Sequence, residues 1–214
     1  GIAEFTNTLP FPLTNAQQRV IDFIIVDLNK GPPMSRLLEG DVGSGKTAVA
    51  AALAYAVVTT PPRDRKYGAL QVAYMAPTEI LANQHFETLN KLGLDVGLAT
   101  ANIKNYKDKD IIVGTHALLN EKIDIKNLGL IVIDEQHRFG VEQRAKLSQK
   151  GKNPHILTMT ATPIPRTVAL TVFGNLDLST LNELPKGRQK IITWIVPPQK
   201  RAGSYNWIDE QIKS

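Results

Sequence analysis

The sequence predicts an α/β domain in which helices cover both faces of a parallel β-sheet. Short apolar runs alternate with helical patterns from about residue 35 to residue 175. Residues 128–133 are almost wholly apolar, as is typical of a central parallel strand that is buried on both faces. The chain of 214 residues, 43% of them hydrophobic, is also long enough to bury a sizeable core.

The first predicted elements surround a glycine-rich loop. An amphipathic helix is expected at residues 15–28, with apolar side chains at Val20, Ile21, Ile24, Ile25 and Leu28. A short strand at 35–39 leads into the loop, and an alanine-rich run at 47–56 predicts a helix directly after it. A strand, a loop and a helix in this order begin a parallel βαβ unit.

The following elements continue the alternation. Strands are predicted at residues 70–75, 96–99, 110–114, 128–133 and 155–160. Helices are predicted at residues 78–92, 141–149 and 166–173. The helix at 78–92 is expected to bury residues at helical spacing, namely Ile80, Leu81, Phe86 and Leu89.

The regular alternation ends after Gly174. A further strand is predicted at 190–196, and a last helix is predicted to start near Ser204. We therefore expect three parts: a disordered end or cloning remnant at 1–8, the α/β domain at 9–189, and a linker with the truncated start of a second domain at 190–214.

Residues 40–47 match the phosphate-loop pattern G-x-x-x-x-G-K-[ST] at every fixed position. Its glycines allow the backbone to curl so that successive N–H groups point at phosphate. The lysine of the pattern reaches the β- and γ-phosphates, and the final hydroxyl can ligate Mg²⁺. A glycine-rich turn can match by chance, but the strand before it and the helix after it favour nucleotide binding. The expected contacts are Gly40, Gly43, Ser44, Gly45, Lys46 and Thr47.

An acidic pair, Asp134-Glu135, follows the apolar run at 128–133. The carboxyl edge of a parallel sheet is where α/β folds bind ligands, so both carboxylates are expected beside the phosphate loop. We expect Asp134 to hold Mg²⁺ and Glu135 to polarise the attacking water. The alternative is a solvent-exposed acidic pair at a strand end.

A second strand end carries hydroxyl groups. Thr160 and Thr162 follow the strand predicted at 155–160, and they are expected to bond to Gln136 or His137 and relay the nucleotide state. A polar helix cap before Pro163 is a compatible alternative.

Composition narrows the functional classes. The net charge of +5 and the isoelectric point of about 9.4 suit a polyanionic partner, although the charge surplus is modest. The sequence has no Cys, which excludes disulfides and thiolate metal sites and agrees with a cytoplasmic location. No apolar run approaches the length of about 20 residues that spans a bilayer. His85 and His116 are not expected to bind metal, because no Cys/His spacing supports a zinc site.

The order of these motifs resembles the first motor domain of superfamily 2 helicases. The wording at residues 134–144 and 160–167 is similar to that of the RecG family of branch-migration helicases. Residues 176–179 and 182–188 resemble the segment that joins the two motor domains of that family. The transcription-repair coupling family shares much of this wording but more often has Glu where Gln136 stands. The resemblance spans roughly residues 9 to 213.

The resemblance implies a RecA-like fold for residues 9–189, ATP and Mg²⁺ as cofactors, and branched DNA such as forks and Holliday junctions as the partner. It implies catalytic roles for Lys46, Asp134, Glu135 and His137. Gln17 would read the adenine edge, and Phe11 or Leu13 would pack on its ring. Two segments resemble DNA contacts, for which ordinary helix capping is the alternative; their residues are Pro77, Thr78, Thr115 and His116.

The resemblance also implies that important parts lie outside this chain. The arginine fingers belong to the second motor domain, and the family's DNA-wedge domain is also missing. We therefore expect the chain alone to bind nucleotide weakly, to hydrolyse it slowly and not to unwind DNA. The alternatives are a coupling-type double-stranded DNA translocase, a nucleotide-gated binding module and an unrelated phosphate-loop enzyme such as a small-molecule kinase.

Overall fold

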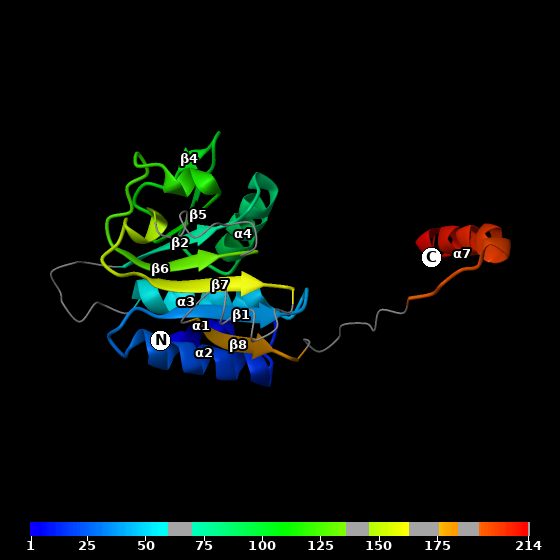
Figure 1. Ribbon diagram of the computed structural model, residues 1–214, viewed down its shortest axis with the longest axis horizontal. Coiled ribbons are helices and arrows are strands. Elements are labelled where there is room, and N and C mark those ends of the chain that lie inside the picture. The colour runs from blue at the N-terminus through cyan, green and yellow to red at the C-terminus, as the bar shows by residue number, and fades with distance from the viewer. Residues whose placement is uncertain (60–69, 136–145, 163–175, 184–192, 214) are drawn as a thin grey trace.

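The computed structural model describes residues 1–59, 70–135, 146–162, 176–183 and 193–213. These residues form an eight-stranded sheet with the order β4-β3-β5-β2-β6-β7-β1-β8 (Figure 1). Neighbouring strands are parallel except for β3 and β4. The predicted α/β fold is confirmed, with one antiparallel edge. The strands are β1 (Ser35–Gly40), β2 (Gln71–Met75), β3 (Val96–Ala99), β4 (Lys104–Asn105), β5 (Ile111–Gly114), β6 (Leu128–Ile133), β7 (His155–Thr160) and β8 (Asp177–Leu181).

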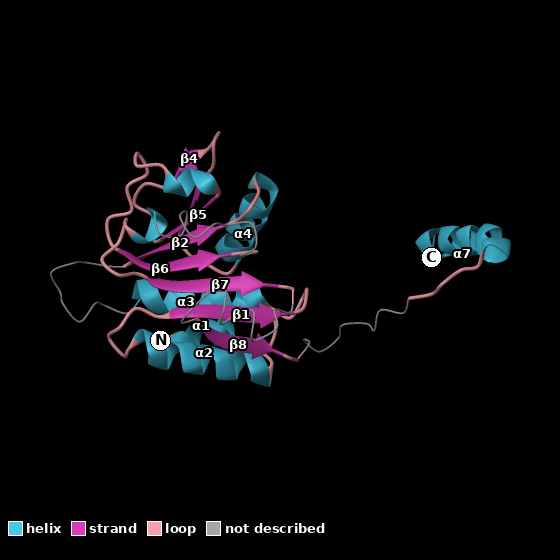
Figure 2. Cartoon of the chain, viewed as in Figure 1, coloured by secondary structure: helices cyan, strands magenta, loops and turns pink. Residues whose placement is uncertain are grey.

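The parallel strands point in one direction, so their carboxyl ends lie along one edge of the sheet (Figure 2). The strand order puts β6, β7 and β1 side by side, and it puts β2 and β5 on the other side of β6. Ligands of open α/β sheets bind at the carboxyl edge. The segments that follow these five strands therefore meet where a ligand is expected.

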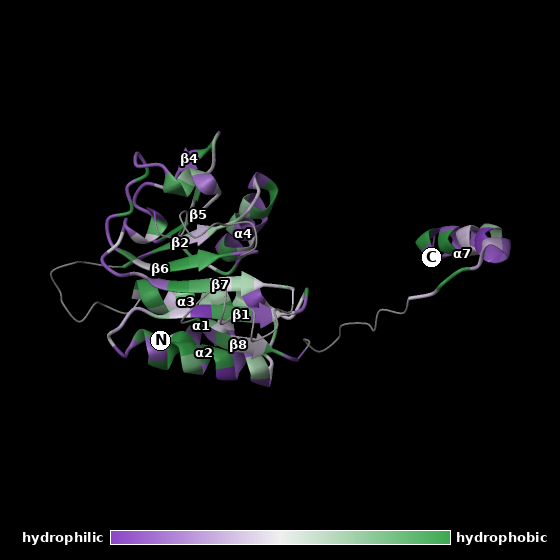
Figure 3. Ribbon diagram, in the orientation of Figure 1, coloured by the Kyte–Doolittle hydropathy of each residue, from purple (hydrophilic) through white to green (hydrophobic). Residues whose placement is uncertain are grey.

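A hydrophobic core lies on each face of the sheet, because successive strand residues point to opposite sides. In β2, Val72 and Tyr74 join one core, and Ala73 and Met75 join the other. All six residues of β6 are buried, and the strand is coloured as hydrophobic in Figure 3. The apolar run at 128–133 is thus a central strand, as predicted.

Helices supply most of the first core: α1 (Ile2–Thr8), α2 (Asn15–Leu28), α3 (Lys46–Thr59) and α4 (Glu79–Lys91). The 3-10 helix η2 (His116–Leu119) contributes Leu118 to the second core. The buried residues Ile123, Ile125 and Leu147 also belong to this core. The helix predicted at 166–173 and most of the one predicted at 141–149 lie outside the described residues.

The amino-terminal segment differs from the expectation of a disordered end. Residues 2–8 form α1, and its Phe5 side chain is only 5% exposed. The Phe5 ring stacks on Tyr55 of α3 with a centroid distance of 4.6 Å. Burial of one aromatic ring stabilises the segment, and a helix of seven residues is too short to show this through periodicity.

The carboxyl-terminal part also differs from the expectation. β8 is a strand of the same sheet and pairs with β1, although no strand was predicted at 177–181. The strand predicted at 190–196 is wrong for residues 193–196, which form no ladder, and residues 190–192 lie outside the described ranges. After the short 3-10 helix η4 (Pro198–Lys200), helix α7 (Arg201–Lys213) begins three residues before the predicted start, and none of its residues is buried.

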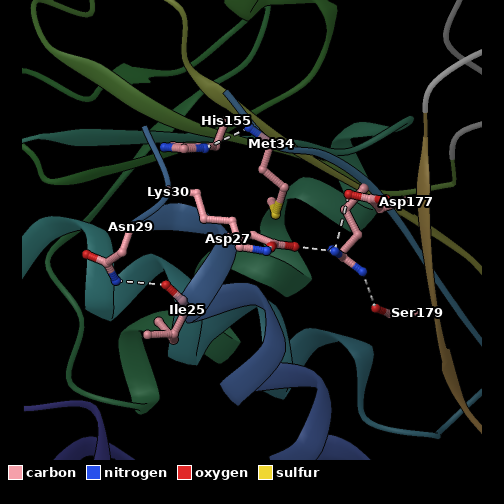
Figure 4. Close-up of polar contacts among 9 residues, drawn as sticks. Ile25, Asp27, Asn29, Lys30, Met34, His155, Asp177 and Ser179 are labelled. Carbon is pink, nitrogen blue, oxygen red and sulfur yellow. Dashed lines mark hydrogen bonds and ion pairs between the residues drawn. The ribbon is translucent and has the colours of Figure 1, made fainter. Parts of the chain in front are cut away.

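A polar cluster fastens the edge strand β8 to β1 and α2 (Figure 4). The nearly buried Arg36 guanidinium forms an ion pair with Asp27, donates to Ser179 Oγ at 2.9 Å and reaches Asp177 Oδ2 at 3.3 Å. Lys30 donates a hydrogen bond to Asp27, and together with Arg36 it lowers the pKa of that carboxyl against the opposing effect of burial. Charged and polar side chains thus help to hold β8, whose two apolar residues, Leu178 and Leu181, do not alternate in the sequence.

The buried face of α4 differs in part from the prediction. Ile80 is 72% exposed, whereas Leu89 is fully buried, as expected. Ala82 and His85 complete the buried face. A hydropathy pattern does not identify a histidine as a buried residue, which is why His85 was missed.

We expect His155 to make the protein less stable in acid. Its Nδ1 accepts a hydrogen bond from the Met34 backbone N–H at 2.9 Å (Figure 4), which requires this nitrogen to be unprotonated. Burial lowers the pKa of His155 below 6.5, so the unfolded chain binds more protons than the folded chain. The stability that the neutral ring contributes is complete above pH 6.5 and is lost as the pH falls through the folded pKa.

Urea unfolding of His155→Asn and the parent chain at about pH 7.5 and about pH 5 measures this effect. The Asn Oδ1 atom can accept the same hydrogen bond and does not titrate. The parent chain should lose more unfolding free energy on acidification than the variant does. His116→Asn, an exposed control, should behave like the parent; an equal acid loss in His155→Asn would contradict the prediction.

Candidate nucleotide-binding site

A cavity of about 500 Å³ opens at the carboxyl edge of the sheet, next to the ends of β1, β6 and β7. It joins the phosphate loop to the acidic pair, which are some ninety residues apart in the sequence. This juxtaposition was the central prediction for the site, and the geometry agrees with it. The lining residues are Phe11, Gln17, Val42, Gly43, Gly45, Lys46, Thr47, Asp134, Glu135 and Ala161.

The phosphate loop curls between β1 and α3. Gly43 and Gly45 have φ angles of +78° and +85°, which favour glycine strongly. The Lys46 ammonium donates to the carbonyl oxygens of Gly40 at 2.6 Å and Asp41 at 3.0 Å. The side chain therefore lies across the loop, where it can also reach a bound phosphate.

Two opposing effects act on the Lys46 ammonium. Partial burial lowers its pKa, and the carboxylates of Asp134, Asp41 and Glu135 oppose that shift. The ammonium group is thus partly shielded from water, which strengthens its attraction for an anion in the cavity.

Gln17 fastens the start of α2 to the phosphate loop. Its side chain is 1% exposed, its Oε1 accepts from the Thr14 backbone N–H at 2.8 Å, and its Nε2 donates to the Ser44 carbonyl at 2.7 Å. Thr14 Oγ1 in turn accepts from the Gln17 backbone N–H, which completes a capping box. Both ends of the Gln17 amide are engaged within the protein, and its contact with adenine stays a prediction.

Other expected nucleotide contacts are distributed unevenly. Phe11 lines the cavity, whereas Leu13 packs against the helical core. The Ser44 side chain is fully buried, and a side chain at Gly40 would overlap its Oγ. Neither Gly40 nor Ser44 lines the cavity, so they shape the loop from behind it.

The acidic pair follows β6 directly. Asp134 Oδ1 accepts from the Glu135 backbone N–H at 3.0 Å, and Asp134 Oδ2 lies 2.8 Å from His85 Nε2. Glu135 has a φ angle of +49°, an uncommon left-handed conformation for a residue with a side chain. Strained backbone of this kind is frequent at functional sites, where surrounding contacts hold it in place.

Tyr74 lies beneath the acidic pair and Thr47. Burial, aided by the negative charge of Asp134, raises the pKa of Tyr74 well above 10 against an opposing effect of Thr47, so the hydroxyl stays neutral. The Tyr74 ring is tilted against the His85 ring with a centroid distance of 4.7 Å. Tyr74 from β2 and His85 from α4 thus pack against each other next to Asp134.

The hydroxyl pair after β7 is ordered. Thr160 Oγ1 lies 2.9 Å from Thr162 Oγ1 and accepts from the Thr162 backbone N–H at 3.2 Å. Its expected partners Gln136 and His137 lie outside the described residues, so the relay stays a prediction.

The expected DNA contacts lie together at the ends of β2 and β5. These strands pair in parallel, and the Ala76 backbone N–H donates to the Gly114 carbonyl at 2.9 Å. Thr78 caps α4 by accepting from the Leu81 N–H at 3.3 Å, and Thr115 caps η2 by accepting from the Ala117 N–H. Thr78 and Thr115 therefore act as helix caps in this structure, as the alternative interpretation expected. DNA contact by Pro77, Thr78, Thr115 and His116 stays a prediction.

Two residues near the site were missed in the sequence. His85 was considered only as a metal ligand, and its role beside Asp134 has no motif. The Glu183 carboxylate, directly after β8, accepts hydrogen bonds from the Ala16 backbone N–H at 3.0 Å and from the Arg19 guanidinium at 3.3 Å. It therefore joins the segment after β8 to the first turns of α2. Such contacts between distant segments leave no periodic signal.

Two negative findings concern the residues that the structure describes. In those ranges, no cluster of three or more His, Cys, Asp or Glu residues has the arrangement of a metal site. Among the helices described, none combines the length and the apolar character that crossing a membrane requires.

The family model for DEAD/DEAH box helicases matches residues 14–171. The chain is 48% identical to the ATP-dependent DNA helicase RecG of Synechocystis sp. over 99% of its own length and 26% of that protein. It is 45% identical to RecG of Bacillus subtilis over 99% of its own length and 32% of that protein. The chain thus spans about a quarter to a third of the length of these curated relatives.

A solved structure of RecG bound to a three-way DNA junction matches with a TM-score of 0.79 and 38% sequence identity. The match covers 99% of this chain and 29% of that one. The sequence resemblance to RecG helicases and the RecA-like fold are therefore confirmed.

Proposed function

Because the chain belongs to the DEAD/DEAH box helicase family, we propose that it is the ATP-binding motor domain of a RecG-type DNA helicase that remodels branched DNA. The main support for this proposal is that one cavity is lined by both the phosphate loop and the acidic pair. An unrelated small-molecule kinase is disfavoured by the family match, and the coupling-type translocase is disfavoured by the matches to RecG.

The proposed reaction is hydrolysis of the γ-phosphate of ATP. Lys46 would neutralise charge that develops on the phosphates, and Glu135 would accept a proton from the attacking water. His137 has a proposed catalytic role from the family resemblance alone. Gln17 and Phe11, which also line the cavity, would position the base.

A magnesium ion fits the residues present. The Thr47 hydroxyl and the Asp134 carboxylate line the same cavity, and oxygen donors are the ligands that Mg²⁺ prefers. Each Asp134 oxygen accepts one hydrogen bond within the protein and keeps lone pairs for a further interaction. When bound, the ion would neutralise charge between the β- and γ-phosphates.

The proposed DNA surface is the neighbouring stretch of the carboxyl edge, at the ends of β2 and β5. The solved RecG relative is bound to a three-way DNA junction, which supports branched DNA as the partner. Residues 9–189 would form the first motor domain, and residues 190–214 would lead to a second motor domain that closes the ATP site. A cytoplasmic location likewise stays a prediction.

Steady-state ATP hydrolysis tests this proposal in two chains: the present one, and a longer one that carries a second motor domain. Each is assayed alone, with linear duplex and with a synthetic four-way junction. The proposal is supported if only the longer chain hydrolyses ATP and if junctions stimulate its rate more than linear duplex does. Equal stimulation by duplex would favour a double-stranded DNA translocase, and no response to DNA would refute the helicase function.

A further inference from the structure

We propose that His85 is a positioning residue that holds the Asp134 carboxylate in the orientation needed to bind the magnesium–nucleotide complex. The inference rests on the proposed function, because it takes Asp134 as the residue that faces the metal. It assigns a role to a residue that belongs to none of the motifs described above.

The contact between the two side chains is short and shielded from water. His85 Nε2 lies 2.8 Å from Asp134 Oδ2, and the two side chains are 11% and 15% exposed. Water competes only weakly with a hydrogen bond in such surroundings, so the bond is stronger than one on the surface. The other carboxylate oxygen accepts from the Glu135 backbone N–H, so both oxygens are restrained from within the protein.

The imidazole ring is itself held in one position. It is tilted against the fully buried Tyr74 ring, and it is carried by α4 between the buried residues Ala82 and Leu89. A histidine that bonds to a carboxylate requires a defined ring orientation, which packing on Tyr74 supplies. The sheet and α4 therefore pre-organise His85, and His85 pre-organises Asp134.

The consequence concerns metal affinity more than nucleotide affinity. Residues that orient a metal-binding side chain typically change metal affinity about 10- to 100-fold when they are replaced. The Lys46 ammonium bonds to Gly40 and Asp41, and the Gln17 amide bonds to Thr14 and Ser44. We therefore expect nucleotide binding without metal to be unaffected by a change at His85.

The test measures the affinity of a fluorescent ATP analogue for the 214-residue chain at increasing Mg²⁺ concentrations and in EDTA. His85→Phe keeps an aromatic ring against Tyr74 and removes the hydrogen bond. We expect the Mg²⁺ concentration for half-maximal enhancement of binding to rise about 10-fold or more, with unchanged affinity in EDTA. His85→Gln, whose amide nitrogen can replace Nε2, should restore most of the parent behaviour.

Three comparisons keep the test decisive. Thermal unfolding reports whether His85→Phe folds; if it does not, His85→Met replaces it, since Met matches Gln in shape and lacks the donor. Glu87→Gln, an exposed change on the same helix, should behave like the parent. A folded Phe or Met variant with the parent Mg²⁺ dependence would overturn the inference. Failure of the parent chain itself to bind the analogue would instead count against the proposed function.

Discussion

Replacement of Glu135 by Gln is expected to lower the rate of ATP hydrolysis about 10²- to 10⁴-fold while nucleotide binding is retained. Gln is nearly isosteric with Glu but cannot accept a proton from water. The Glu135 backbone N–H, which bonds to Asp134, is unchanged by the substitution, so the acidic pair keeps its geometry. The loss should therefore fall on the chemical step.

The measurement is single-turnover hydrolysis by the longer chain that carries a second motor domain, with analogue binding as the second readout. Glu121→Gln, an exposed change at another loop, is the matched control and should retain the parent rate. A hydrolysis rate within about threefold of the parent would remove Glu135 from the proton-transfer role, since such catalysis contributes about 10² or more.

Replacement of Gly45 by Ala is expected to abolish nucleotide binding and to destabilise the fold by about 2–4 kcal/mol. Gly45 has a φ angle of +85°, and a β-carbon there would overlap the Gln17 amide nitrogen. That amide is held by Thr14 and Ser44, so it can move only if both hydrogen bonds break. The substitution therefore combines backbone strain with loss of the link between α2 and the phosphate loop.

A matched glycine separates these two effects. Gly93 has nearly the same φ angle, +80°, and open space where a β-carbon would stand. Gly93→Ala should cost only the backbone strain, about 1–2 kcal/mol in urea unfolding, and should keep nucleotide binding. Equal unfolding free energies and equal nucleotide affinities for the two variants would contradict the steric argument at Gly45.

The arrangement of strand ends would allow one domain to combine the two proposed tasks. Along the carboxyl edge, the ends of β1, β7 and β6 surround the cavity, and the ends of β2 and β5 carry the proposed DNA contacts. Helix α4 follows β2 and brings His85 back to Asp134 at the end of β6. The proposed DNA surface and the proposed ATP site are thus adjacent, because β2 pairs directly with β6.

Local patterns in the sequence were sufficient for most of the sheet and for the core of the site. Largely apolar runs located β2, β3, β5, β6 and β7, because strands that are buried on both faces contain few polar residues. β1, which contains Arg36 and Glu39, was located by its place directly before the phosphate loop. The phosphate loop was recognisable because its glycines and lysine are required within eight consecutive positions. Asp134 and Glu135 were predicted at its side because parallel strands end at one edge.

Contacts between distant segments decided the rest. β8 depends on Arg36 and its acidic partners, and α1 depends on one buried ring, so neither has a periodic apolar pattern. The hydrogen bonds of the Gln17 amide to Thr14 and Ser44 were not foreseen, and its contact with adenine stays a prediction. His85 gained its place beside Asp134 only when α4 packed on the sheet, where its ring meets Tyr74 of β2.

The sequence by itself therefore determined the α/β architecture, the phosphate loop and the acidic pair, since each depends on residues that are close together in the chain. Only the tertiary structure decided the edge strand, the anchoring of the loop by Gln17 and the contact of His85 with Asp134. These features depend on contacts between groups that are 27 to 143 residues apart, and such contacts are determined by packing rather than by local sequence.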